Sequence, residues 1–400
     1  MRVALYYPWV YLTSGAERTI LELTGRSRHR WTIFTNRFDP TATFPGFGER
    51  DVVELGRVPV KRTAAAAARG ALRLLFQRLP LQDYDALVVV CEGMGDLVAL
   101  RNRGVPAMCI LLTPLRAVFD EDYRRRCLAG KSAAERALIR AGSCAFRLVD
   151  RLAWRRYRRV VAISSEAARR AVTGGLVRAD GIEVVHPGLG FEPAAPSPES
   201  GSYFLLPGRI MWTKNIELGI QAFLHFRETA GADAARFRLV IAGIVDTKSQ
   251  PYFARLRAMA EPGQGSIEFR VHPSDAEMAS LYAGCYATLF TAFNEDWGIV
   301  PLESMAFGKP VIAVNRGGPS ESVIHEVNGL LEEPTPERFA SAMLRLVQSP
   351  SRCRELGEAG HLHSKRYSWT VFADRIDGAV ESLARRPLPR TAASPEESFR

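Results

Sequence analysis

The segment between residues 287 and 314 constrains the fold of this chain more than any other. An apolar run, Ala287–Phe290, has the length of a buried strand, and Pro310–Val314 reads as the next one. One short helix fits between them. Pro301 suits its first position and Gly308 the left-handed residue after its last turn. Strands alternating with helices predict an α/β fold with parallel sheets.

Two glutamates lie eight positions apart around the start of this helix. Glu295 falls on the preceding loop and Glu303 in the first helical turn. The amides of Gly298, Ile299 and Val300 have no partner inside the helix, so together with the helix dipole they favour a bound phosphate. Each carboxylate would then bind sugar or ribose hydroxyls on one side of the phosphate. Alternatively, Glu303 only complements the dipole and Glu295 is a solvated loop acid.

A second motif combines an arginine and a lysine. Arg209 and Lys214 follow the apolar run Tyr203–Leu206 and precede a helix expected at 216–226. Open α/β sheets bind ligands at this carboxyl end of a strand. Either cation alone would read as ordinary surface charge.

Together these segments resemble family 4 glycosyltransferases, which are retaining enzymes with the GT-B fold. That fold has two facing Rossmann-like domains with parallel sheets and a deep interdomain cleft. Glu295 and Glu303 match the family's E-x7-E element, and Arg209 and Lys214 match its G-R-x4-K-(N/G) element. The resemblance implies that Arg209 and Lys214 hold the donor diphosphate and stabilise the charge that it accumulates on leaving. It also implies that Glu295 binds the donor sugar and Glu303 the ribose, without a metal or another cofactor.

The amino-terminal half also alternates strands and helices. Strands are expected at 3–7, 31–35, 87–91, 107–112 and 160–163. After the first strand, Thr13–Arg18 is similar to the family's G-G-A-E-R turn, with Ser14 in place of the first glycine. The resemblance places this loop opposite the donor sugar, where Gly15 would allow close backbone approach. Alternatively, Gly15 serves only the turn from strand to helix.

One stretch departs from the family pattern. Leu111–Arg116 resembles the Y-x-H-T-P-x-R stretch of a mannosyltransferase-like branch, but Leu112 stands where the histidine is expected. Thr113 or Arg116 could supply the missing contact on the sugar or acceptor side, or the register differs by one residue. Asp83 and Asp85 form a D-x-D pattern, which we interpret as a polar turn rather than a metal site.

Four hundred residues predict two domains. The proline-rich stretch 193–198 marks the crossover between them. We expect an acceptor-side domain over 1–195, completed by a carboxyl-terminal helix over about 368–386. A nucleotide-sugar-binding domain follows over 201–367, with strands expected at 203–206, 238–242, 267–271 and on both sides of the glutamate motif. The stretch 387–400 has the composition of a disordered tail.

The net charge of +10 is concentrated in one region, where seven arginines face one acid between Arg140 and Arg159. Apolar residues recur among these arginines at steps of three and four, namely Phe146, Val149, Leu152, Ala153 and Tyr157. Such a basic amphipathic helix can bind an anionic membrane surface, and 61–78 is a second candidate. Alternatively, both apolar faces pack on the sheet and the arginines are solvated. No nucleic-acid recognition module accompanies them. No apolar run spans a bilayer, and the six cysteines include no C-x2-C pair, so we expect a cytoplasmic protein, free or peripheral on the inner membrane face.

These features predict a retaining glycosyltransferase that moves a hexose from a nucleotide sugar to a hydroxyl of a saccharide or lipid-linked acceptor. The sequence around Glu295 most resembles the mannosyltransferase-like branch, so GDP-mannose is the first donor to test. Two alternatives remain open: a nucleotide-sugar epimerase of the same architecture, and a binding protein without turnover.

Overall fold

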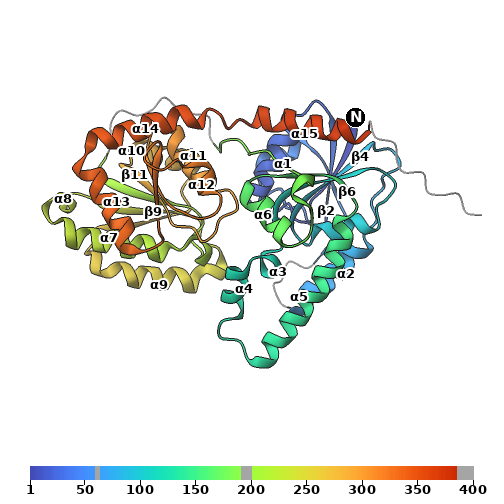
Figure 1. Ribbon diagram of the computed structural model, residues 1–400, viewed down its shortest axis with the longest axis horizontal. Helices are drawn as coiled ribbons and strands as arrows, with labels where there is room; N and C mark the ends of the chain where they lie inside the picture. The colour runs from blue at the N-terminus through green and yellow to red at the C-terminus, as the bar shows by residue number, and fades with distance from the viewer. Residues whose placement is uncertain (59–63, 191–200, 385–400) are drawn as a thin grey trace, which may run out of the picture. The chain divides into compact units, whose positions relative to one another are not determined.

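The computed structural model describes residues 1–58, 64–190 and 201–384. The chain divides into two compact units, and the first combines both ends of the sequence. Unit 1 comprises Met1–Pro187 with Trp369–Arg400, and unit 2 comprises Gly188–Ser368. Each unit is a parallel sheet flanked by helices (Figure 1).

Unit 1 contains a seven-stranded parallel sheet in the order β3-β2-β1-β4-β5-β6-β7. Its strands are β1 (Arg2–Tyr6), β2 (Arg30–Thr35), β3 (Asp51–Glu54), β4 (Ala86–Gly93), β5 (Ala107–Pro114), β6 (Tyr157–Ala162) and β7 (Ile182–Val184). Its helices are α1 (Gly15–Arg26), α2 (Ala64–Phe76), α3 (Arg116–Phe119), α4 (Glu121–Leu128), α5 (Ala133–Trp154), α6 (Ser165–Thr173) and α15 (Trp369–Ala384). The five strands expected here are confirmed, whereas β3 and β7 were not predicted.

Helix α15 brings the carboxyl-terminal segment back to unit 1, where it packs against α1 (Figure 1). Its Asp377 is almost fully buried and accepts hydrogen bonds from the hydroxyl of Ser27 and the backbone N–H of Arg28, just after α1. A buried carboxylate needs such partners. These bonds fix α15 to the first helix of the chain.

Unit 2 contains a six-stranded parallel sheet in the order β10-β9-β8-β11-β12-β13. Its strands are β8 (Tyr203–Pro207), β9 (Arg238–Gly243), β10 (Ile267–Val271), β11 (Ala287–Phe290), β12 (Val311–Val314) and β13 (Gly329–Glu332). Its helices are α7 (Ile216–Ala230), α8 (Ala232–Ala235), α9 (Gln250–Ala260), α10 (Asp275–Gly284), α11 (Ile299–Ala306), α12 (Pro319–Ser322), α13 (Pro336–Gln348) and α14 (Pro350–Ser364). Only β13 was not expected.

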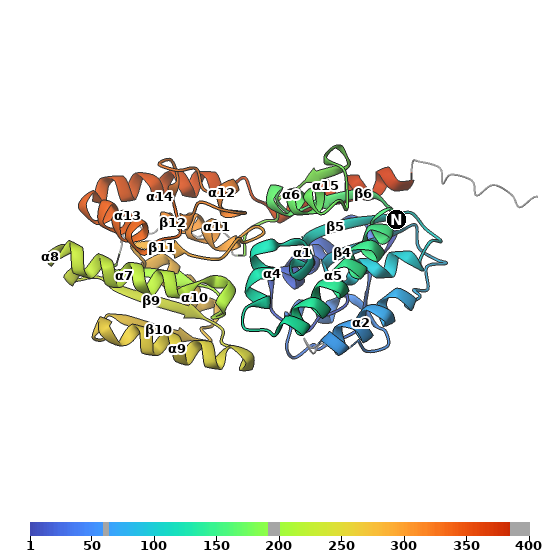
Figure 2. The same ribbon diagram turned by 60° about the horizontal axis from the view of Figure 1, so that its bottom comes forward.

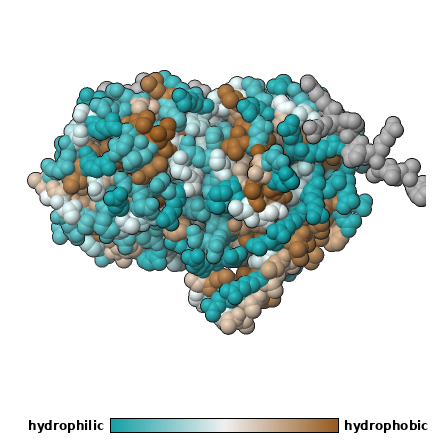
Figure 3. Space-filling model, in the orientation of Figure 1, coloured by the Kyte–Doolittle hydropathy of each residue, from teal (hydrophilic) through white to brown (hydrophobic). Residues whose placement is uncertain are grey.

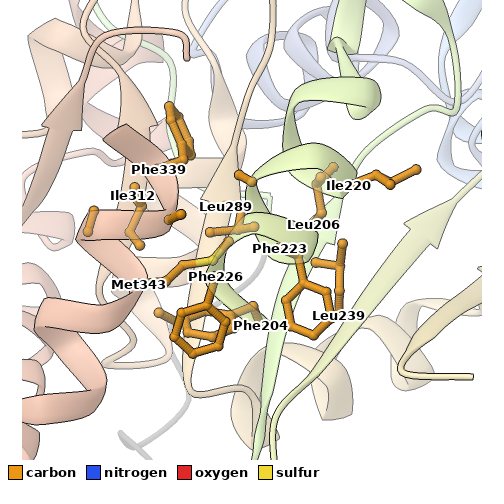
Figure 4. Packing of buried hydrophobic residues seen from close by; sticks show 14 of the residues in the cluster. Phe204, Leu206, Ile220, Phe223, Phe226, Leu239, Leu289, Ile312, Phe339 and Met343 are labelled. Atoms are coloured by element: carbon orange, nitrogen blue, oxygen red, sulfur yellow. The ribbon is translucent and has the colours of Figure 1, made fainter. Parts of the chain in front are cut away.

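The main core of unit 2 lies between its sheet and helices α7 and α13. Phe204 of β8 packs among Phe223 and Phe226 of α7, with Met343 of α13 in the same cluster (Figure 4). The ring of Phe204 meets that of Phe226 edge to face, with centroids 5.6 Å apart. This packing anchors β8, whose carboxyl end carries one of the two predicted motifs.

The basic segment of unit 1 differs from its prediction. The sequence suggested one amphipathic helix from Arg140 to Arg159, but α5 ends at Trp154, and Arg158 and Arg159 lie in β6. The predicted apolar side chains Phe146 and Val149 pack into the core of unit 1, as the alternative reading proposed. No helix among the described residues is long and apolar enough to cross a membrane.

Candidate functional site

Both motifs of unit 2 lie at the same edge of its sheet. From β8 the chain moves outward to β9 and β10 and then returns to place β11 on the other side of β8. The loops that leave β8 and β11, 208–215 and 291–298, therefore start from the carboxyl ends of adjacent strands. Open α/β sheets bind their ligands at such a reversal of strand order.

Hydrogen bonds join the two loops directly. The backbone N–H of Phe293 donates to the carbonyl of Thr213 at 2.7 Å, and the hydroxyl of Thr291 donates to the carbonyl of Lys214 at 2.8 Å. Asn215 and Asn294 both have φ of 47°, in the left-handed region that asparagine tolerates better than most residues. These bonds fix the backbone around the predicted cation and carboxylate.

Lys214 and Glu295 form an ion pair across the two loops. The lysine Nζ lies 2.5 Å from Oε2 of Glu295, and the side chains are only 20% and 24% exposed. Nζ also lies 5.8 Å from the ring centre of Phe290, at the end of β11. The structure thus brings together two predicted donor-binding groups that are 81 residues apart in the sequence.

Arg209 lies on the same edge but makes no hydrogen bond or ion pair with any described residue. Its side chain is exposed, and it follows Gly208, whose φ is 136°. A side chain at the neighbouring Gly243, at the end of β9, would collide with the carbonyl of Gly208. Two glycines therefore permit the tight backbone path that presents Arg209 to solvent.

Helix α11 begins earlier than its proline suggested. Gly298, with φ of 83°, is the amino-terminal cap, and Ile299 is the first helical residue. The prediction of Pro301 at the first position is therefore wrong: proline takes the third position, which also needs no N–H partner within the helix. Glu303 consequently falls in the second turn rather than the first.

The amides of Gly298, Ile299 and Val300 lie at this helix start, as predicted. Within the described part of the chain, none of these three N–H groups makes a hydrogen bond. A side chain at Gly298 would be strained by its φ and would crowd the ring of Phe290. At the other end, Gly308 has φ of 70° and closes the helix as expected.

Glu303 is oriented by a tyrosine from the preceding helix. The hydroxyl of Tyr282, in α10, donates to Oε2 of Glu303 at 2.6 Å. Burial and the charge of Glu303 raise the pKa of Tyr282 well above its ordinary value, so the phenol stays protonated. The other oxygen, Oε1, lies against Gly190, where an added side chain would collide with it.

Three further residues support this site and were not predicted. Gly317 and Gly318 follow β12, and the N–H of Gly318 donates to the carbonyl of Glu295 at 2.8 Å. Added side chains there would collide with the backbone of the 295–297 loop. A Gly-Gly pair after a predicted strand could have indicated this role. Tyr282 carries no comparable sequence pattern.

Of the residues predicted in unit 1, Gly15 opens helix α1 behind Ser14, whose hydroxyl caps the helix. Glu17 is almost fully buried and accepts a hydrogen bond from Ser14. Burial raises the pKa of Glu17 to about 7, against the lowering effect of this bond, and the charge of Glu92 adds to the increase. Gly15 thus sits beside a carboxyl group that titrates near neutrality.

Leu112, Thr113 and Arg116 lie at or just after the carboxyl end of β5. Leu112 is buried, which agrees with its apolar character, and Thr113 is partly exposed. Arg116 is already engaged: its guanidinium donates to Oδ2 of Asp120 at 3.1 and 2.9 Å. Burial alone would raise the pKa of Asp120, but the N–H of Tyr123 and the arginine charges hold it below its usual value.

The two aspartates of the D-x-D pattern lie at the other end of the unit 1 strands. Asp83 and Asp85 precede β4 at its amino end, and Asp85 accepts a hydrogen bond from the backbone N–H of Arg2 at 2.7 Å. Among the described residues, one buried group has the atoms to hold a metal ion, formed by Cys91, Asp96 and Cys109 inside unit 1. There the thiol of Cys91 donates to Asp96 at 2.6 Å, so the group is satisfied by its own hydrogen bond.

Comparison with known proteins shows which proteins this chain resembles. Residues 191–363 match the family model described as Glycosyl transferases group 1. The alpha-1,3/1,6-mannosyltransferase ALG2 of Mus musculus is 34% identical over 187 residues, 45% of each chain. That of Homo sapiens is 32% identical over 218 residues, covering 50% of this chain and 52% of the relative. The chain thus spans about half the length of the curated relatives that it matches.

Solved structures share the fold over almost the whole chain. The crystal structure of Anabaena Alr3699/HepE in complex with UDP superposes with a TM-score of 0.71 at 17% identity, covering 96% of this chain and all of that one. WaaG, a glycosyltransferase involved in lipopolysaccharide biosynthesis, gives a TM-score of 0.66 at 14% identity, covering 94% and 99%. At these identities the likeness shows the fold alone. The chain has the GT-B fold, its residues 191–363 match the Glycosyl transferases group 1 model, and its similarity to the ALG2 mannosyltransferases agrees with the expected resemblance to the mannosyltransferase-like branch.

Proposed function

We propose that this protein is a retaining glycosyltransferase that moves a hexose from a nucleotide sugar to a hydroxyl of a saccharide or lipid-linked acceptor. Mannose is the first hexose to test. The observation that carries the proposal is the joined pair of loops at the β8–β11 edge. It combines Lys214, Glu295 and the amino terminus of α11 where sheets of this kind bind nucleotides.

The donor diphosphate would be bound by Arg209, Lys214 and the amides of Gly298, Ile299 and Val300. Each of these groups is cationic or an N–H donor, so each stabilises the charge that grows on the leaving diphosphate. Because these groups already supply positive charge and N–H groups, binding of the diphosphate needs no metal ion. An oxygen of the departing diphosphate would help to deprotonate the acceptor hydroxyl, so no enzyme nucleophile is required.

The two glutamates would bind hydroxyl groups of the donor. Glu303, which accepts a hydrogen bond from Tyr282 and has its Oε1 beside Gly190, would bind the ribose. Glu295 would bind the donor sugar after Lys214 turns from it to the diphosphate. This exchange couples the two events, because a diphosphate without a sugar takes the lysine from the carboxylate and supplies no hydroxyl in its place.

In unit 1, Gly15, Thr113 and Arg116 are proposed contacts on the donor-sugar or acceptor side. Thr113 is the stronger candidate of the latter two. Arg116 would have to give up its ion pair with Asp120, at 2.9 Å, before it could bind a sugar.

The proposal of mannose, and of GDP-mannose as its donor, is supported by the ALG2 mannosyltransferases among the relatives. Two other similar proteins leave the identity of the donor open. Relatives also include a D-inositol 3-phosphate glycosyltransferase of Acidothermus cellulolyticus, 30% identical over 230 residues, covering 54% of this chain and 50% of the relative. The Alr3699/HepE structures contain UDP or UDP-glucose.

A thermal-shift screen tests the donor site without knowledge of the acceptor. A ligand that binds only the folded protein raises the melting temperature, so GDP-mannose, UDP-glucose, GDP and UDP can be compared directly. Arg209→Ala should remove the shift, whereas Arg257→Ala, an exposed arginine on α9, should keep it. No shift with any nucleotide or nucleotide sugar in the wild-type protein would contradict the proposal.

A further inference from the structure

The sheet of unit 1 has a reversal of strand order of its own. From β1 the chain moves outward to β2 and β3 and then returns to place β4 on the other side of β1. Strand β4 pairs with β1 on one side and with β5 on the other, and Figure 2 labels β4 and β5. The carboxyl ends of β1 and β4 therefore form the kind of edge at which open α/β sheets bind ligands, as the ends of β8 and β11 do in unit 2 by their topology.

A tyrosine and a glutamate meet at this β1–β4 edge. Tyr7 directly follows β1, and Glu92 is the last residue but one of β4. The hydroxyl of Tyr7, which is almost fully buried, donates to Oε2 of Glu92 at 2.7 Å. Burial, together with the charge of Glu92, raises the pKa of Tyr7 well above its ordinary value, so the phenol stays protonated. A buried donor thus holds one oxygen of this carboxylate in place.

The other oxygen of Glu92 is available to a ligand. The side chain is exposed, and within the described part of the chain it forms no ion pair and accepts no second hydrogen bond. Hydrophilic residues cover most of the face that Figure 3 shows, so exposure alone does not mark a ligand-binding glutamate. Glu92 differs from an ordinary surface acid because a buried tyrosine orients it at a reversal of strand order.

The amino terminus of α1 lies at the same edge, but it does not suit an anion. Its first turn contains Glu17, which is almost fully buried and accepts hydrogen bonds from the N–H of Leu12 and the hydroxyl of Ser14. A carboxylate in this position uses the positive end of the helix dipole, which would otherwise attract a phosphate. Helix α11 of unit 2, by contrast, has no acid in its first turn.

The two edges therefore differ in the charge that they offer. The β8–β11 edge carries Arg209 and Lys214, whereas the β1–β4 edge carries Glu92, which has no cationic partner among the described residues. A diphosphate is attracted to the first edge and repelled by the second. A sugar hydroxyl, which is neutral and can donate, suits Oε1 of Glu92.

We propose that Glu92 determines acceptor specificity: its carboxylate accepts hydrogen bonds from hydroxyl groups of the acceptor, and the part of the acceptor that it binds is a neutral saccharide without phosphate. This role rests on the proposed transferase function, because a transferase needs a second substrate besides the nucleotide sugar. A phosphate monoester carries about −1.5 to −2 charges near neutral pH. Glu92 would therefore repel a phosphorylated acceptor and retain its neutral counterpart.

Saturation-transfer NMR with matched saccharides tests this role. The probes are the methyl glycosides of mannose, glucose and galactose, each compared with its 6-phosphate, and the protein is first saturated with the nucleotide that gives the largest thermal shift. We expect at least one neutral glycoside to bind the wild-type protein, and its 6-phosphate to bind at least about tenfold more weakly.

Two variants change the charge of Glu92. Glu92→Gln should weaken binding of the neutral glycoside by roughly five- to tenfold, because a charged acceptor of hydrogen bonds becomes a neutral amide. It should also reduce the discrimination against the 6-phosphate to less than about threefold, because the repelling charge is gone. Glu92→Lys should reverse the preference, so that the 6-phosphate binds more tightly than the neutral glycoside.

The matched control is Glu49→Gln. Glu49 is also an exposed glutamate of unit 1, but it lies just before β3, at the amino edge of the sheet, and forms no ion pair with any described residue. This variant should keep both the affinity and the discrimination of the wild-type protein. Three results would overturn the proposal: no binding of any neutral glycoside, equal binding of a glycoside and its 6-phosphate by the wild-type protein, or unchanged binding in Glu92→Gln.

The nucleotide-induced thermal shift separates this role from the proposed function. Absence of the shift in the wild-type protein would contradict the nucleotide-sugar site of unit 2. A normal shift with unchanged saccharide binding in Glu92→Gln would instead refute only the role of Glu92. The same shift in Glu92→Gln, Glu92→Lys and Glu49→Gln would show that the three variants are folded.

Discussion

The ion pair between Lys214 and Glu295 leads to a quantitative prediction for Glu295→Gln. In the wild-type protein, a nucleoside diphosphate must take Lys214 from a carboxylate 2.5 Å away, in a pair that is about three quarters buried. A hydrogen bond to a charged group contributes about 1.5–3 kcal/mol. Removing the competing charge should therefore tighten the binding of GDP or UDP by up to roughly 10- to 150-fold.

Glu295→Gln should not increase the affinity for the nucleotide sugar in the same way. Its sugar hydroxyls are proposed to bind Glu295, so Glu295→Gln removes an attraction as well as a competitor. The preference for the nucleotide sugar over the nucleoside diphosphate should therefore fall by about one to two orders of magnitude. Isothermal titration calorimetry with both ligands measures this ratio.

Two variants complete this test. Glu358→Gln, an exposed glutamate of α14, should leave both affinities unchanged. Lys214→Ala should weaken both ligands, since both contain the diphosphate. If a folded Glu295→Gln protein bound the nucleoside diphosphate no more tightly than the wild type, the proposed exchange of partners would be refuted.

Three further predictions concern metal, backbone and pH. Activity should survive EDTA, because side chains and amides bind the diphosphate; complete loss with recovery on adding manganese would instead show that the reaction requires a metal ion. Gly318→Ala should lower the melting temperature and weaken nucleotide binding, because its Cβ would collide with the backbone of Trp297; unchanged values for both would show that the loop adapts freely. Burial, with the charge of a neighbouring carboxylate, raises the pKa of Asp150 well above its usual range. Its contribution to stability is complete below about pH 4 and is lost as the pH rises through the raised pKa, by up to about 1.4 kcal/mol per pH unit. Denaturant titrations should therefore show a smaller loss of stability between about pH 4 and pH 9 in Asp150→Asn, and equal slopes in both proteins would refute this assignment.

The sequence predicted the elements whose signal is local. Runs such as Arg238–Gly243 and Ala287–Phe290 are continuous and apolar, because parallel strands are buried on both faces. The strands that escaped prediction are short: β7 has three residues, and β3 and β13 have four each. In β3 most side chains are exposed, so the apolar pattern is absent.

The predicted motifs also contain most of the residues of the candidate site in unit 2, but they do not show how its parts meet. Lys214 and Glu295 are 81 residues apart, and only the return of the chain to β11 makes them neighbours. The start of α11 was misplaced because the left-handed Gly298 begins the helix before the proline. Likewise, Tyr282 reaches Glu303 through packing of α10, which no local pattern encodes.

Helix α5 shows a different limit of sequence reasoning. Phe146, Val149 and Leu152 were predicted to share one apolar face, whereas in the structure Phe146 and Val149 pack into the core and Leu152 is exposed. Hydrophobic periodicity reports that a helix is amphipathic but not which apolar face meets protein. Exposure of Leu138 and Leu148 became visible only once the packing of the helix was known.

Acceptor-dependent release of nucleoside diphosphate tests the central claim most directly. The protein is incubated with the nucleotide sugar selected by the thermal-shift screen, with and without a mixture of saccharide and lipid-linked acceptors. We expect diphosphate release only when the acceptors are present, and a decrease of about 100-fold or more in kcat for Arg209→Ala, the scale of losing one transition-state donor. Conversion of the nucleotide sugar without an acceptor, or wild-type turnover by a folded Arg209→Ala protein, would contradict the account.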